Sequence, residues 1–395
     1  MDKLNGALKS TILTTGLAMF SMFFGAGNIV FPLALGQFSK DMNPFAIMGL
    51  IISAVIVPFT GLISMILFKG DYKEFFARIG KWPGFLLSMV IMGLIGPFGA
   101  IPRCVTLSYS SIAMFLPENA IELPLFSALS CLIILFFTVK PSKILDILGF
   151  FLTPFLLISL GIIILVGFYQ AGSLPESGLE PAEVFKMGFK EGYQTMDLLG
   201  AFFFSSVIIL GLKADYNPKT SEDVKNLISM AIKASMIGAA LLTLVYVGFS
   251  FLAAYMSLSL DGVPKDRILG AISLNVLGPY AGVVTSVAVA LACLTTAIAL
   301  ANVFAHFLHV DILQHRLGYV PSLLITLAAT YFISTLQFTG IVKFLAPPLA
   351  ACYPALIGLS LLNIFYKLYD FKPVKVFVLI IFLATLLAEY GYLIF

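Results

Sequence analysis

Two short polar stretches interrupt long apolar segments of this chain, and both carry residues suited to binding a small charged solute. The first consists of Gly25, Ala26, Gly27 and Asn28, a group rich in poor helix formers. The second runs over residues 192–197 and includes Gly192, Tyr193, Thr195 and Asp197. In an apolar solvent, a broken helix survives only where protein or a water-filled cavity receives its freed amides and carbonyls. The two stretches therefore predict a solute-binding cavity.

The composition identifies the surroundings of these stretches as a lipid bilayer. Of the 395 residues, 60% are hydrophobic and only 11% are charged, and the mean hydropathy is +1.04. A water-soluble fold of this length cannot bury so much apolar surface. The net charge of +3 argues against nucleic acid as a partner. We expect an all-α polytopic membrane protein with one transmembrane domain over residues 1–395, and the oligomeric state stays open.

Apolar windows of about 20 residues predict eleven membrane spans. The estimated spans are 10–35, 44–68, 84–115, 123–139, 145–168, 184–212, 226–256, 279–308, 320–336, 338–364 and 374–394. A short helix over 266–278 is expected to lie on one face. Residues 72–81 are expected to form an interfacial helix on the other face, with Phe75 and Phe76 as anchors.

The basic residues predict the orientation. With a cytoplasmic N-terminus, the inner connectors hold fifteen of the 23 Lys and Arg residues and the outer connectors hold five. The positive-inside rule therefore favours a cytoplasmic N-terminus, and an odd number of spans places the C-terminus outside.

The two breaks occupy equivalent places in two halves of the chain. Gly25 lies 16 residues after Lys9, and Asp197 lies 16 residues before Lys213, so both breaks lie at similar depth. Span one runs outward and span six runs inward, and five spans separate the two. This spacing predicts a five-plus-five inverted repeat with discontinuous helices 1 and 6. The first repeat covers about 8–168, the second about 184–364, and an extra helix about 374–394.

The direction of each half-helix predicts what it binds. The outer half of span one begins at its break, so its free N–H groups and dipole favour a carboxylate. The outer half of span six ends at its break, so its carbonyls favour an ammonium group or a cation. An α-amino acid carries both groups. The apolar wall expected around them, which suits an aliphatic side chain, comprises Phe23, Phe24, Tyr193, Phe202, Phe203 and Phe204.

Span eight carries the residues expected to hold a cation. Thr295 and Thr296 place two hydroxyls one turn from the Ala292 carbonyl. Carbonyls freed near Ser21 and Phe24 could complete a shell of five uncharged oxygens, which suits Na⁺ as an ion that must leave again.

Four motifs resemble those of the bacterial branched-chain amino acid:cation symporters. They are the segments at residues 24–32, 96–103, 192–200 and 292–297, and the segments at 140–146 and 346–354 agree with them. The resemblance implies a LeuT-like fold and Na⁺-driven uptake of leucine, isoleucine and valine across the cytoplasmic membrane. It also implies a sodium position at Ser21, Phe24, Ala292, Thr295 and Thr296, and substrate contacts at Gly25, Ala26, Gly27, Tyr193 and Thr195. That family usually has twelve spans, one more than the number estimated for this chain.

Each feature also has a simpler interpretation. Glycines in spans often mark close helix packing, and threonines often bond back to carbonyls one turn earlier. Asp197 can cap the inner half of span six or contact the ion or substrate. Arg103 can form a structural ion pair, extend to the outer face or contact a gate.

Other functions fit the sequence less well. An intramembrane enzyme needs a metal or carboxylate constellation, and the chain has three scattered histidines and no His-Glu-x-x-His motif. A passive channel needs a continuous polar stripe rather than two short breaks. Proton coupling and a wider range of apolar substrates, including methionine, stay open.

Overall fold

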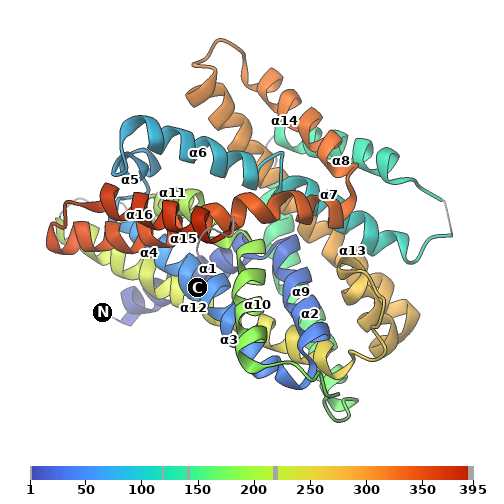
Figure 1. The fold of residues 1–395 in the computed structure, drawn as a ribbon. Helices are drawn as coiled ribbons and strands as arrows, with labels where there is room; N and C mark the ends of the chain where they lie inside the picture. Colours follow the sequence, from blue (N-terminus) through green and yellow to red (C-terminus); the bar gives the residue numbers. More distant parts are fainter. Residues whose placement is uncertain (1, 118–119, 140–142, 217–220, 390–395) are drawn as a thin grey trace.

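The computed structural model describes residues 2–117, 120–139, 143–216 and 221–389, and it shows an assembly of helices (Figure 1). The α-helices of the first half are α1 (Asp2–Phe23), α2 (Ala26–Ser39), α3 (Asn43–Ile51), α4 (Val57–Leu67), α5 (Tyr72–Ala77), α6 (Lys81–Ile95), α7 (Ala100–Ala113), α8 (Leu123–Val139) and α9 (Lys143–Tyr169). Those of the second half are α10 (Pro181–Gln194), α11 (Asp197–Tyr216), α12 (Ser221–Tyr255), α13 (Ile268–Phe307), α14 (Tyr319–Ser334), α15 (Gln337–Tyr369) and α16 (Val374–Glu389). Short 3₁₀ or π segments are η1 (Lys40–Met42), η2 (Ile52–Ile56), η3 (Lys265–Arg267) and η4 (Leu308–Ile312).

Many of these helices are apolar enough to lie in a membrane. In the described part of the chain, five continuous or near-continuous helical stretches have the length and composition to cross a bilayer, and five shorter apolar helices accompany them. Every predicted span corresponds to one helix or to consecutive helices of the structure. Residues 390–394 of the last predicted span, and Lys140 and Lys219 of the predicted inner connectors, lie outside the described residues.

Both predicted breaks are present. The first helix ends at Phe23, and α2 begins at Ala26. In the sixth predicted span, α10 ends at Gln194 and α11 begins at Asp197. Met196 between them has a φ of 61°, a left-handed conformation that is rare for a residue with a side chain. Such strain persists only where the surrounding structure holds it, and it is frequent at functional sites.

A third break was not predicted. The span expected to run over 84–115 consists of α6 and α7, which are separated by Gly96, Pro97, Phe98 and Gly99. The Gly96 amide still donates to Met92 O, but the Gly96 backbone then leaves the helical region (φ −92°, ψ −129°). A proline next in the sequence disfavours helical geometry for the residue before it, which accounts for the interruption.

The two broken helices pack in a reciprocal way. Helices α1 and α2 lie along α12, whereas α10 and α11 lie along α3 and α4. Each broken helix therefore packs against the span that follows the other broken helix. Glycines allow close contact at these crossings: Gly36 of α2 faces the Ser250 backbone of α12, and Gly188 of α10 faces the Ala46 backbone of α3. This exchange is the packing expected of an inverted repeat. The repeat boundaries themselves stay predictions.

The two short helices predicted between spans are both present. Residues 268–277 are helical as predicted, and Gly278, with φ 78°, separates them from the rest of α13. Residues 72–77 also form a helix, but Phe75 and Phe76 are 0% and 1% exposed. The expectation that they anchor the helix at the membrane surface is wrong, because both rings pack inward on Phe202.

Candidate functional site

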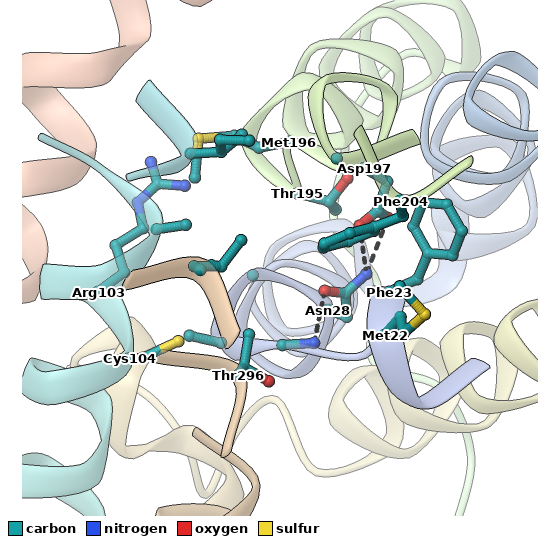
Figure 2. Close-up of a pocket in the computed structure, with 17 residues that line it drawn as sticks. Met22, Phe23, Asn28, Arg103, Cys104, Thr195, Met196, Asp197, Phe204 and Thr296 are labelled. Carbon is teal, nitrogen blue, oxygen red and sulfur yellow. Dashed lines mark hydrogen bonds between the residues drawn. The ribbon is translucent and has the colours of Figure 1, made fainter. Parts of the chain in front are cut away.

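The breaks enclose a cavity of about 50 Å³ (Figure 2). Its lining comes from α1, α2, α6, α7, α11, α13 and the residues at the two breaks. The lining residues are Met22, Phe23, Gly25, Ala26, Gly27, Asn28, Ile95, Ala100, Arg103, Cys104, Thr195, Met196, Asp197, Gly200, Phe204, Thr296 and Leu300. One cavity is therefore bordered by both predicted breaks and by both sides of the unpredicted third break. One predicted ion-site residue, Thr296, also lines it.

The two breaks touch through their backbones. A β-carbon on Gly27 would lie 3.0 Å from Thr195 Cα and 3.2 Å from Thr195 O. A β-carbon there would require the neighbouring backbone to shift by a few tenths of an ångström. Gly27 therefore allows the start of α2 and the end of α10 to meet.

A buried polar network connects the first break to the second. Asn28 Nδ2 donates to Asp197 Oδ1 at 2.9 Å and to Oδ2 at 2.8 Å, and it also contacts the hydroxyl of Tyr246. The Tyr246 hydroxyl donates to Asp197 Oδ2 at 2.9 Å. Asn28 Oδ1 accepts the Gly25 amide at 3.0 Å, which caps the first turn of α2. Figure 2 shows the Asn28 and Asp197 side chains pointing toward each other.

Asp197 does not cap α11. The Gly200 amide donates to Met196 O at 3.1 Å, so Met196 stands at the cap position and Asp197 lies in the first turn. Its carboxylate is directed at α2 and α12 instead, and the residue is 4% exposed. No ion pair to Asp197 exists in the described part of the chain. The helix N-terminus still favours the negative charge.

Arg103 binds the end of α10. Its Nη1 donates to Gln194 O at 2.6 Å and its Nη2 donates to Gln194 Oε1 at 2.7 Å. The side chain is 1% exposed and its Nε has no hydrogen-bond partner among the described groups. The interpretations of Arg103 as an ion pair or as a side chain reaching the outer face are therefore wrong.

The carbonyls at the end of α10 already have protein donors. Gly192 O accepts the Thr195 hydroxyl at 2.8 Å, Tyr193 O accepts the Met196 amide at 3.1 Å, and Gln194 O accepts Arg103. The Arg103 guanidinium thus binds the C-terminal end of α10. The sequence had predicted a bound cation or substrate ammonium group at this position. In this conformation, Asp197 is the remaining negative group on the cavity wall.

Of the two predicted ion-site threonines, Thr296 lies beside the first break. Thr295 and Thr296 both donate to Ala292 O, at 2.9 and 3.0 Å. The Thr296 methyl carbon lies 3.6 Å from the position that a β-carbon on Gly25 would take. In the break itself, the Phe24 amide donates to Phe20 O at 2.8 Å, and Ser21 lies one turn earlier on α1. The back-bonding interpretation of the threonines is therefore observed, and it leaves the lone pairs of both hydroxyls available.

Other predicted residues lie away from the cavity. Gly192 packs against Ser53 of η2, and Tyr193 stacks on Tyr353 at 4.4 Å between ring centroids. Of the predicted aromatic wall, Phe23 and Phe204 line the cavity. The others turn elsewhere: Phe24 stacks on Phe20, whereas Phe202 and Phe203 pack toward α5.

Several members of the site were not singled out from the sequence. Tyr246 lies in α12, and a hydroxyl within an apolar span is the only sequence signal of its role. Ile95 and Ala100 reach the cavity because the third break bends the chain there. The two glycines and the proline of the segment Gly96-Pro97-Phe98-Gly99 are the sequence feature that could have predicted this break.

Solved structures share this architecture. An inward-facing structure of Mhp1 superposes with a TM-score of 0.64 at 16% identity, covering 91% of this chain and 77% of that one. A closed structure of Mhp1, a transporter of the nucleobase-cation-symport-1 family with bromovinylhydantoin bound, gives 0.61 at 15% identity and covers 92% and 81%. At these identities the likeness establishes the fold, which is that of the LeuT-like transporters.

Sequence comparison gives the family. The branched-chain amino acid permease BrnQ of Bacillus subtilis (strain 168) is 31% identical over 379 residues, covering 92% of this chain and 83% of that protein. A family model described as "Branched-chain amino acid transport protein" matches residues 8–392. Its members are transporters rather than enzymes, and they are multi-pass membrane proteins. The chain therefore belongs to the family of branched-chain amino acid transport proteins.

Proposed function

We propose that this transporter is a secondary active symporter that imports leucine, isoleucine and valine together with Na⁺. It would act in a bacterial cytoplasmic membrane with its N-terminus on the cytoplasmic side. One observation carries the proposal: the two broken helices meet at Gly27 and Thr195, beside a cavity that both of them line. Movement of one repeat against the other then exposes that cavity to each side in turn.

The cavity wall suits a zwitterion with an aliphatic side chain. The N-terminus of α2 favours the substrate carboxylate, and Asp197 is placed to accept its ammonium group. Arg103 and Asp197 contribute one charge of each sign to the lining, and Met22, Phe23, Phe204 and Leu300 contribute apolar surface. A cavity of about 50 Å³ holds a few water molecules but not a whole amino acid. Binding therefore requires the half-helices to separate, as alternating access demands.

The Na⁺ site is proposed at Thr295, Thr296 and the Ala292 carbonyl, completed by carbonyls of Ser21 and Phe24. Each threonine hydroxyl donates its proton to Ala292 O and retains lone pairs for a cation. Because Thr296 also borders the substrate cavity beside Gly25, a cation there would stabilise the same break that receives the substrate carboxylate. That shared element links ion binding to substrate binding.

A thermal-shift panel of the purified protein tests this function. Leucine, isoleucine or valine should raise the melting temperature by several degrees in Na⁺ buffer, and by much less in choline buffer. Asp197→Asn should lose the leucine-dependent shift. Glu183→Gln, which removes an exposed carboxylate from the same broken helix, should keep it. Equal shifts in Na⁺ and choline buffers would rule out Na⁺ coupling and favour protons, and an equal response to methionine would widen the substrate range.

A further inference from the structure

A second cavity, of about 280 Å³, lies away from the two breaks. It is enclosed by α5, the first half of α6, and the end of α13 with η4. Its lining residues are Tyr72, Lys73, Phe76, Ala77, Lys81, Gly84, Phe85, Ser88, Phe307 and Asp311. The positive-inside pattern places these elements on the predicted cytoplasmic side. The transport mechanism proposed above makes no use of this cavity.

One carboxylate satisfies only part of the positive charge around this cavity. Asp311 pairs with Lys73 at 2.5 Å and accepts the Tyr72 hydroxyl at 2.9 Å. Burial and the Asp311 carboxylate raise the pKa of Tyr72, so its hydroxyl stays a neutral donor. Lys81 forms no ion pair with any described residue. The ammonium of Lys375 lies 3.9 Å from the position that a β-carbon on Gly80 would take, and it also has no described partner.

Neighbouring cations already have partners. Lys367 pairs with Glu74 at 2.9 Å, and the Arg78 guanidinium lies over the Tyr366 ring at 3.8 Å from its centroid. Lys81, which lines the cavity, and Lys375, whose ammonium lies near Gly80, therefore keep their charge for a ligand. An anion is the complementary ligand.

The mouth also continues into an apolar surface. Trp82, directly after Lys81, is 78% exposed, and the following turns of α6 expose further apolar side chains: Phe85, Leu86, Met89 and Val90. In a membrane helix, such a face contacts acyl chains, and tryptophan is typical of the interface. Phe76, Phe85 and Phe307 extend the apolar surface into the cavity itself.

We propose that this cavity binds the phosphate headgroup of an anionic phospholipid, with Lys81 and Lys375 as its counter-ions and the outer face of α6 along its acyl chains. A free phosphate would use the lysines but not the adjoining apolar face. Basic pockets between helices on the cytoplasmic side are suited to such headgroups, and each nearby lysine contributes a several-fold preference.

Trp82 is the only tryptophan of the chain and therefore reports on this site alone. The protein is placed in nanodiscs of equimolar phosphatidylglycerol and phosphatidylcholine, with brominated chains on one lipid or on the other. Bromine on phosphatidylglycerol should quench Trp82 fluorescence several-fold more strongly. Lys81→Gln and Lys375→Gln should each reduce this ratio up to about fivefold. Lys186→Gln, which changes a lysine of the opposite predicted face, should leave it unchanged.

Asp311→Asn is a variant expected to change the quenching ratio in the opposite direction. It frees Lys73, so the quenching ratio should rise rather than fall, which a misfolded protein would not produce. Equal quenching by the two lipids in the natural protein would overturn the proposal, and so would a ratio insensitive to both Lys81→Gln and Lys375→Gln. Inorganic phosphate at about 10 mM, compared with chloride of equal ionic strength, should not abolish the ratio. If it does, the site binds free phosphate and the lipid assignment is wrong.

Discussion

At the scale of single residues, Asp197 connects the parts of the site. Its carboxylate accepts hydrogen bonds from Asn28 of α2 and Tyr246 of α12, while its own backbone begins α11. A buried carboxylate without a paired cation is costly in a membrane protein, and such residues mark substrate or ion pathways. The three donor contacts lower that cost and hold the carboxylate at the edge of the cavity. A bound cation or ammonium group would lower it further.

Thr296 allows the proposed ion site to be tested separately from the substrate site. Thr296→Ala removes one oxygen ligand, and we expect the Na⁺ concentration for half-maximal uptake to rise about tenfold. Leucine affinity at saturating Na⁺ should change much less. Thr243→Ala is the matched control, because Thr243 makes the same hydrogen bond one turn back, to Ala239 O, on α12. An unchanged Na⁺ requirement in Thr296→Ala would remove this residue from the ion site.

At the scale of elements, the sequence predicted the breaks better than the side chains around them. Glycines grouped with polar residues in an apolar span favour a broken helix, so residues 25–28 and 192–197 predicted the two breaks. The third break was missed because Gly96, Pro97 and Gly99 stand in an otherwise apolar run. The aromatic wall was partly wrong because a helix that is apolar all round does not reveal which face its phenylalanines turn to. The hydrogen bonds of Asn28 and Arg103 join residues 169 and 91 positions apart, and local patterns do not predict such pairs.

Contact between the two breaks is the element-scale feature most open to test. Gly27→Ala places a methyl group 3.0 Å from Thr195 Cα. The nearest atoms all belong to the backbone of Thr195 and Gln194, so no flexible side chain can move aside. Such overpacking typically costs about 1–3 kcal/mol, so we expect leucine transport to fall about tenfold or more. Gly161→Ala adds the same methyl group on α9, where nothing lies within 4 Å, and should transport normally. If the two variants transport equally well in proteoliposomes, close contact between the breaks is not required.

At the scale of the whole molecule, the reciprocal packing of α1 and α2 on α12, and of α10 and α11 on α3 and α4, relates the two halves. In an inverted repeat, these halves cross the membrane in opposite directions, so the same motion opens one side and closes the other. The predicted eleven spans and cytoplasmic N-terminus would place the C-terminus outside. Alkaline phosphatase fused after Phe395 should be active in cells, and green fluorescent protein at the same point should be dark. The reverse result would contradict the predicted orientation or number of spans.

Coupled transport is the central claim, and uptake into proteoliposomes measures it most directly. Radiolabelled leucine should accumulate above its external concentration when an inward Na⁺ gradient is imposed, and unlabelled leucine inside should accelerate exchange, as in a carrier. Without Na⁺, an inward proton gradient should drive little uptake. Equal accumulation driven by protons in Na⁺-free buffer would contradict the account.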